Sequence, residues 1–113
     1  MLYALIVFAI AALGGLTLAA VYVLQGRLAP WPLSLLHAAL GAIGLVLLIY
    51  AAMSTGLPGT AIAALVILAI AALGGFYLAS IHLRGEVARK SIVFIHAGVA
   101  VIGFLALLGA VLS

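Results

Sequence analysis

Three histidines, His37, His82 and His96, are the side chains of this 113-residue sequence best suited to chemistry. The chain holds one carboxylate side chain and no cysteine, so it lacks a carboxylate pair for acid–base work, a thiolate and a disulfide. A neutral imidazole can coordinate a metal ion through one ring nitrogen and form a hydrogen bond through the other. Metal coordination and hydrogen bonding are therefore the chemistries to be considered.

Two of the histidines have similar surroundings in the sequence. Small residues stand at positions i+4 and i+7 after each one: Gly41 and Gly44 after His37, and Ala100 and Gly103 after His96. In a helix these positions share a face with the histidine. Each imidazole is therefore expected to stand beside a stripe of minimal side chains, which leaves room for a flat group.

The elements that carry these residues are four long apolar segments. The chain is 71% hydrophobic and 4% charged, a composition typical of a protein whose solvent is lipid. The segments are Leu2 to Leu24, Leu33 to Ser54, Thr60 to Leu83 and Ser91 to Leu112. Because about 20 helical residues cross a bilayer core of about 30 Å, each segment predicts a transmembrane helix.

We therefore predict an all-α membrane protein, a four-transmembrane-helix bundle that forms a single domain over residues 1–113. The connections, 25–32, 55–59 and 84–90, are short enough to require antiparallel hairpins. The first segment is expected to be retained as a helix, because no basic region precedes it and it is longer than the apolar part of a signal peptide.

An internal match relates the two halves of the chain. The sequence AIAALGG occurs at 9–15 and again at 69–75. With one residue dropped, the match continues from Gly26, His37 and Gly44 to Gly85, His96 and Gly103. We interpret this as two tandem helical-hairpin repeats, approximately 1–56 and 57–113, related by a pseudo-two-fold axis along the membrane normal. The helices that bear His37 and His96 can then lie diagonally opposite each other.

The basic residues indicate an orientation. All of them, Arg27, Arg84, Arg89 and Lys90, lie in the first and third connections. By the positive-inside rule, loops 25–32 and 84–90 are predicted to be cytoplasmic and both termini to lie on the outer side, in the inner membrane of a bacterium. Four cations divided between two short loops form no extended basic surface, so nucleic acid is not an expected partner.

The diagonal histidines predict a b-type haem between His37 and His96, with both imidazoles as ligands of the haem iron. Clearance for the macrocycle is expected from Gly41, Gly44 and Gly103, and from Gly15 and Gly75 on the other two helices. The cations Arg27, Arg84, Arg89 and Lys90 lie on the side where the propionates could emerge. The second ring nitrogen of each ligand is expected to donate to the carbonyl one turn earlier, at Leu33 or Ile92, with the Ser34 hydroxyl as another choice on the second segment.

His82 leaves several roles open. Its counterpart in the first repeat is Tyr22, so the match is broken there. It could replace one axial ligand, form a hydrogen bond to a haem propionate, bind a quinone head group, or be an ordinary interfacial histidine. Zinc is disfavoured, because Glu86 in a loop is the sole carboxylate that could complete the ligand set.

The stretches LSLLHAALGAIGLVLL and IVFIHAGVAVIGFLALLG resemble the histidine-bearing helices of small b-type membrane cytochromes of the cytochrome b561-like group. The resemblance implies haem ligation by histidines on non-adjacent helices. Members of that group usually carry two histidine pairs and two haems, whereas three histidines support one haem at most. The implied function is an electron-transfer subunit that exchanges electrons with quinol or a partner complex and is not an autonomous enzyme.

Two other functions compete with this one. A cofactor-free structural or assembly subunit would use the small-residue faces for packing against a larger membrane complex or a second copy of the chain. A small multidrug transporter would match in length and number of helices. Transporters of that kind depend on a glutamate in their first helix, and residues 2–24 contain no acidic side chain.

Overall fold

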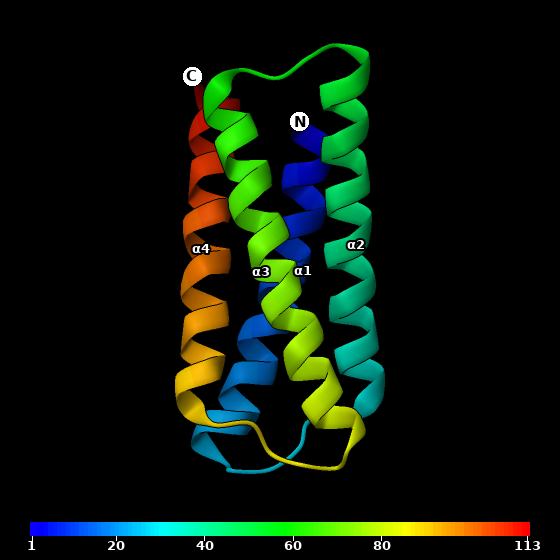
Figure 1. Ribbon diagram of the computed structural model, residues 1–113, viewed down its shortest axis with the longest axis vertical. Helices are drawn as coiled ribbons and strands as arrows, with labels where there is room; N and C mark the ends of the chain where they lie inside the picture. The colour runs from blue at the N-terminus through cyan, green and yellow to red at the C-terminus, as the bar shows by residue number, and fades with distance from the viewer.

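The chain folds into four long antiparallel helices without strands, as the composition predicts (Figure 1). The computed structural model describes all of residues 1–113. The helices are α1 (Leu2–Leu24), α2 (Trp31–Ser54), α3 (Gly59–Leu83) and α4 (Lys90–Leu112). All four are long and apolar enough to cross a membrane, so the protein is an integral membrane protein.

Three helices begin one or two residues earlier than the apolar segments indicate. The start of α2 moves from Leu33 to Trp31 because Pro30 takes the N-cap position and Pro32 falls in the first turn. A proline there is tolerated, since the first-turn N–H groups have no partner within the helix. Counted from the observed starts, His37 and His96 each follow the first residue of their helix by six positions, which is about 9 Å along the axis.

Helix α3 ends in a C-terminal capping motif that contains a glycine. Gly85 adopts a φ of 74°, a left-handed conformation that favours glycine. The backbone N–H of Glu86 donates to the carbonyl of Ile81 and that of Gly85 to the carbonyl of His82. These two bonds form a Schellman motif, which satisfies carbonyls that the helix end would otherwise leave free. The motif fixes the chain direction directly after His82.

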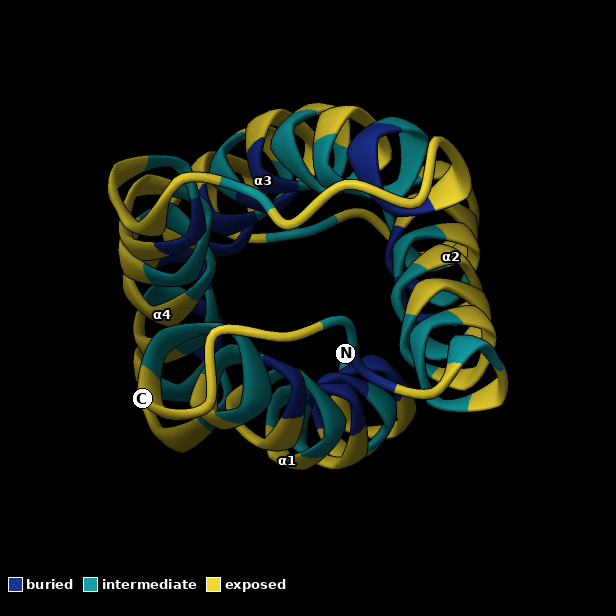
Figure 2. Cartoon of the chain, turned by 90° about the horizontal axis from the view of Figure 1, so that it is seen from below, coloured by how far each residue is buried: buried dark blue, intermediate teal, exposed yellow.

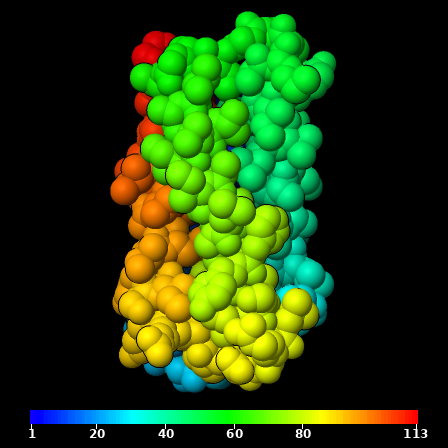
Figure 3. Space-filling view, viewed as in Figure 1, coloured from blue at the N-terminus to red at the C-terminus, as the bar shows by residue number.

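Seen end on, the four helices form the four sides of a square (Figure 2). The closest pairs are α1 with α2 and α3 with α4, and each of these pairs is one hairpin. The contacts of α1 with α4 and of α2 with α3 close the bundle, whereas α1 lies diagonally opposite α3 and α2 opposite α4. In the space-filling view α3 lies against α4 on one side and α2 on the other (Figure 3). The diagonal position of α2 and α4 agrees with the sequence interpretation.

Tight packing of large side chains is concentrated in one half of the bundle. The main hydrophobic cluster consists of Ala4, Leu5, Phe8, Leu48, Ala64, Leu68 and Leu107. These residues come from the beginnings of α1 and α3 and the ends of α2 and α4. They therefore surround the end that carries the two termini and the α2–α3 connection (Figure 1). The histidines lie toward the other end.

The clearance predicted at Gly44 and Gly103 is wrong in this structure. A Cβ atom added at Gly44 would lie 2.7 Å from the Phe8 ring, and one added at Gly103 would lie 2.8 Å from Leu68 Cγ. Both glycines accept a large side chain from a neighbouring helix, and both are buried. They serve the packing of the hydrophobic cluster because their missing side chains are replaced by those of Phe8 and Leu68.

Substitution of Gly44 by alanine is expected to destabilise the bundle by about 1–3 kcal/mol, the usual cost of overpacking a filled core. The Phe8 ring would have to move, and it is held within the cluster. The loss is measurable as a lower midpoint of unfolding in mixed detergent, followed by circular dichroism. Gly41→Ala is the matched control, because an added Cβ there meets nothing within 4 Å. Equal midpoints for the two variants would contradict this packing role.

Candidate functional site

The site is built on His37 of α2 and His96 of α4, whose imidazoles face each other across the bundle diagonal. Their ring centroids are 6.3 Å apart and the ring planes are nearly perpendicular, at 87°. The backbones of α2 and α4 are not neighbours, so the two side chains meet by reaching into the interior from opposite sides. The structure thus brings together the two histidines that the sequence singles out.

Each ring is held by a carbonyl oxygen from the other helix of its own hairpin. Nδ1 of His37 donates to the carbonyl of Ala11 at 2.8 Å, and Nδ1 of His96 donates to that of Ala71 at 2.9 Å. The prediction that Leu33, Ile92 or Ser34 would accept these bonds is wrong. Ala11 and Ala71 occupy the same place in the AIAALGG match, so the two hairpins hold their histidines in the same way.

These hydrogen bonds define which ring nitrogen is free. A carbonyl oxygen can only accept, so the proton of each neutral ring resides on Nδ1. Nε2 of His37 and of His96 then carries an unshared lone pair, and neither atom forms a hydrogen bond within the protein. A backbone carbonyl that fixes one ring nitrogen while the other stays available is the usual outer-shell arrangement of a metal-ligating histidine.

Glycine pairs on α1 and α3 make room for the two rings. A Cβ atom at Gly15 would lie 2.8 Å from Cε1 of His37, and one at Gly75 would lie 3.2 Å from Cε1 of His96. A Cβ atom added at Gly14 would lie 3.8 Å from the Cβ atom of His37, and one added at Gly74 would lie 3.8 Å from the Cβ atom of His96. Gly15 and Gly75 therefore serve as seats for the imidazoles, a role more specific than the general clearance predicted from the sequence.

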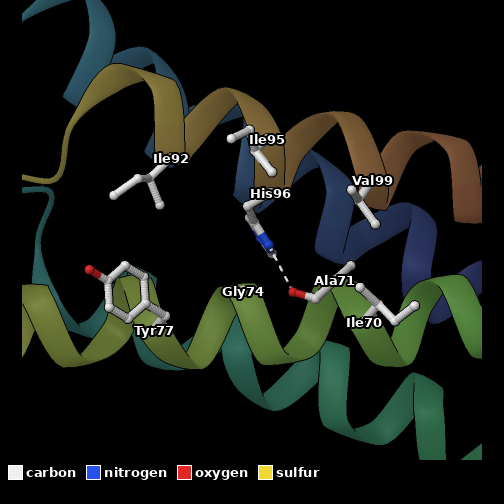
Figure 4. A pocket seen from close by; sticks show the side chains of 8 residues that line it. All are labelled: Ile70, Ala71, Gly74, Tyr77, Ile92, Ile95, His96 and Val99. Atoms are coloured by element: carbon white, nitrogen blue, oxygen red, sulfur yellow. Dashed lines mark hydrogen bonds between the residues drawn. The ribbon is translucent and has the colours of Figure 1, made fainter.

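A cleft of about 330 Å³ adjoins His96 between α3 and α4 (Figure 4). Its walls are Ile70, Ala71, Gly74, Tyr77, Ile92, Ile95, His96 and Val99. Ile70, Tyr77 and Ile95 are more than half exposed, so the cleft opens on the outer surface of the bundle, where lipid would lie. His96 points through the space left by Gly74 to its acceptor at Ala71 (Figure 4).

His82 is not part of the diagonal pair. Its Nδ1 lies 2.9 Å from the hydroxyl of Tyr22 and 2.9 Å from the hydroxyl of Ser34, and its ring packs edge to face against Trp31 with centroids 4.7 Å apart. The side chain is buried, with 8% of its surface exposed. The contacts of Tyr22 and Trp31 with His82 link α1, α2 and α3 near the loop end, and no pattern in the sequence pointed to either contact.

The cations occupy the same end of the molecule as the histidines, at the solvent-exposed connections. Arg27 donates from Nε to the side-chain oxygen of Gln25, and Arg84 lies 3.9 Å from the Glu86 carboxylate. Arg89 is the N-cap of α4 and Lys90 its first residue. All four side chains are exposed, so they can reach anionic groups at this end of the bundle.

The ligand set restricts the metal chemistry. No group of three or more histidine, cysteine or carboxylate side chains comes together in the structure. A closed tetrahedral zinc site, which needs four protein ligands, is therefore not formed. Two imidazoles are sufficient for haem iron, because the macrocycle supplies the remaining four nitrogen ligands.

Comparison of the chain with models of known protein families, with curated proteins and with solved structures finds no match.

Proposed function

We propose that this protein is a small membrane b-type cytochrome, an electron-transfer subunit that holds one haem between His37 and His96. The observation that carries the proposal is the pair of facing imidazoles, each with Nδ1 bound to a carbonyl and Nε2 unshared. Chance packing explains one such ring readily. Two rings with the same outer hydrogen bond, facing each other from diagonal helices, are what a two-ligand centre requires.

The separation of the rings fits an ion held between them. A bond from imidazole nitrogen to a first-row metal is about 2.0 Å, so each ring centroid would lie about 3 Å from the metal. Two imidazoles on opposite sides of one ion would then have centroids about 6 Å apart, and the observed value is 6.3 Å. This spacing, with an Nε2 atom on each ring that forms no hydrogen bond within the protein, supports an iron ion ligated by both histidines.

The protein residues would bind, orient and shield this group. Haem with two histidine ligands supplies reversible one-electron transfer and has no open position for oxygen chemistry. The carbonyls of Ala11 and Ala71 would keep both rings in the correct tautomer and make them better ligands. Arg27, Arg84 and Arg89 are the side chains available to neutralise propionates at the loop end.

The proposal includes a topology and partners. Loops 25–32 and 84–90 would face the cytoplasm, where their cations are favoured by anionic lipid head groups. The haem would then lie nearer the cytoplasmic face, and electrons would be exchanged there with quinol or a partner complex. The exposed apolar side chains of all four helices leave surface for lipid, a second copy of the chain or a larger complex.

Absorption spectroscopy tests the proposal directly. The protein is expressed with added haem precursor, purified in mild detergent, and measured oxidised and after reduction with dithionite. We expect a Soret band that shifts on reduction and a sharp α band, with about one haem per chain by pyridine haemochrome assay. A pure, folded preparation without a Soret band, which also takes up no added haemin, would refute the proposal.

A second function is favoured by a different observation. Gly44 and Gly103 are filled by Phe8 and Leu68, and such close packing of small residues also occurs in membrane subunits without cofactors. A structural or assembly subunit of a larger membrane complex would use the fold in this way. The same spectra decide between the two, because a structural subunit would be colourless.

A further inference from the structure

We propose that the pocket beside His82 binds the head group of a membrane quinone. The pocket is lined by Leu28, Trp31, His82 and Leu83, at the end of the bundle formed by the connection from α1 to α2 and by the end of α3. The proposed binding of the quinone ring depends only on these lining residues. Its role as the site that exchanges electrons with the haem rests on the proposed function.

The hydrogen bonds of His82 indicate a donor directed to a ligand. Two hydroxyl groups, those of Tyr22 and Ser34, converge on Nδ1, each at 2.9 Å. Nδ1 is the one acceptor that either hydroxyl meets outside the pair, so one of them donates to its single lone pair, and we place the ring proton on Nε2. This tautomer is opposite to that of His37 and His96. The Nε2–H group of His82 has no partner within the protein and can donate to an oxygen atom.

The shape and chemistry of the pocket suit a flat, neutral ring. It is an open depression of about 320 Å³, against whose wall a flat ring can lie. The walls are an indole, an imidazole and two leucines, so apolar contact would hold the ring and one N–H group would orient it. The carbonyl oxygen of a quinone is an acceptor of the required kind.

A lipid phosphate is a poorer occupant of this pocket. Phosphate binding requires several donors or a cation, and His82 is the single polar residue of the lining. The two arginines nearest in sequence, Arg27 and Arg84, do not line the pocket. The pocket therefore favours a neutral acceptor.

Several residues that depart from the internal match lie in or beside this pocket. His82 corresponds to Tyr22 at an offset of 60, and Ser34 and Trp31 correspond at an offset of 59 to Val93 and Lys90. The diagonal histidines and their carbonyl acceptors, in contrast, are the same in both hairpins. A function present once per chain would produce a difference of this kind, and a single small-molecule site beside a symmetric centre is such a function.

Trp31 supplies the measurement, because it is the one tryptophan of the chain. The detergent-purified protein is titrated with decylubiquinone and the tryptophan emission is recorded. Because bound haem also quenches tryptophan, the titration is repeated with the variant His37→Ala/His96→Ala. We expect saturable quenching in both, since the ring would contact Trp31 directly.

Variants of His82 test the donor. His82→Phe keeps an aromatic ring and removes the N–H group, and we expect quinone affinity to fall about tenfold, as for loss of one useful hydrogen bond in an apolar site. His82→Gln offers an amide donor and should keep affinity closer to that of the unmodified protein. If His82→Phe does not fold, quinone affinity is measured in His82→Gln and in Tyr22→Phe. The second variant removes the hydroxyl that contacts Nδ1 of His82.

A displaced tryptophan controls for quenching by quinone dissolved in the detergent. The variant Trp31→Phe/Tyr3→Trp moves the reporter to Tyr3, which is 78% exposed at the opposite end. Its quenching should be linear and not saturable. Linear quenching at Trp31, unchanged affinity in His82→Phe, or competition by phosphatidylglycerol instead of quinone would overturn the proposal. Saturable quenching in an unmodified protein that takes up no haem would support this pocket and refute the cytochrome.

Discussion

Replacing either diagonal histidine with alanine is expected to remove haem from the protein. His37→Ala or His96→Ala would leave the iron one protein ligand, and the unreplaced ring could not hold the macrocycle alone in a bundle open to detergent. We expect the haem content per chain to fall by at least about tenfold, which corresponds to a loss of binding energy of about 1.4 kcal/mol or more. The α band of the reduced protein should disappear with it.

His82→Ala is the matched control for these two variants. His82 is the third histidine of the chain, but its contacts are with Tyr22, Ser34 and Trp31, and it does not reach the diagonal pair. Its removal should leave the haem content within about twofold of the unmodified protein, well below the effect of losing an iron ligand. If His82→Ala loses haem while His96→Ala retains it, the assigned ligand pair is wrong. Added imidazole should partly restore the α band to His37→Ala and have no effect on the unmodified protein.

Enlarging Gly15 or Gly75 is expected to have an effect nearly as large, although neither residue would touch the iron. A leucine at Gly15 would occupy the space of the His37 ring, because even a Cβ atom there lies 2.8 Å from Cε1. The imidazole would have to turn away from Ala11 and from the bundle diagonal. Haem content should fall in Gly15→Leu and Gly75→Leu while helical content remains high.

The control for these variants is Gly98→Leu. Gly98 is two residues from His96 on the same helix, is exposed, and has nothing within 4 Å of an added Cβ. The alanine variants should be graded: Gly15→Ala, with the 2.8 Å contact, should lose more haem than Gly75→Ala, where the contact is 3.2 Å. Equal haem content in Gly15→Leu and Gly98→Leu would show that the seat of His37 does not matter for the cofactor.

Position along the membrane limits what such a cytochrome could do by itself. His37 and His96 lie about 9 Å from the loop end of helices that are 23 to 25 residues long, or about 35 Å. One haem at that level leaves most of the bilayer thickness without a redox group. Under the proposed function, electrons would be exchanged on one side of the membrane, and the pocket at His82 lies on that same side.

The architecture was predictable from the amino-acid pattern alone. Uninterrupted apolar segments can satisfy their backbone groups in lipid only as helices, so the number of helices, their approximate bounds and their antiparallel order followed from composition and short connections. The internal match also indicated that His37 and His96 would share one level. These features depend on periodicity and length, which a linear sequence contains.

The contacts between particular atoms depend on how the helices pack. The carbonyls of Ala11 and Ala71 could not be identified as acceptors from the sequence, because any helical carbonyl of a neighbouring helix has the same chemical character. Packing also decided that Phe8 fills the space at Gly44 and that His82 joins Tyr22 and Ser34. A glycine leaves space beside the helix because it has no side chain. The distance and rotation of the neighbouring helices determine whether an aromatic ring, a leucine or a cofactor occupies that space.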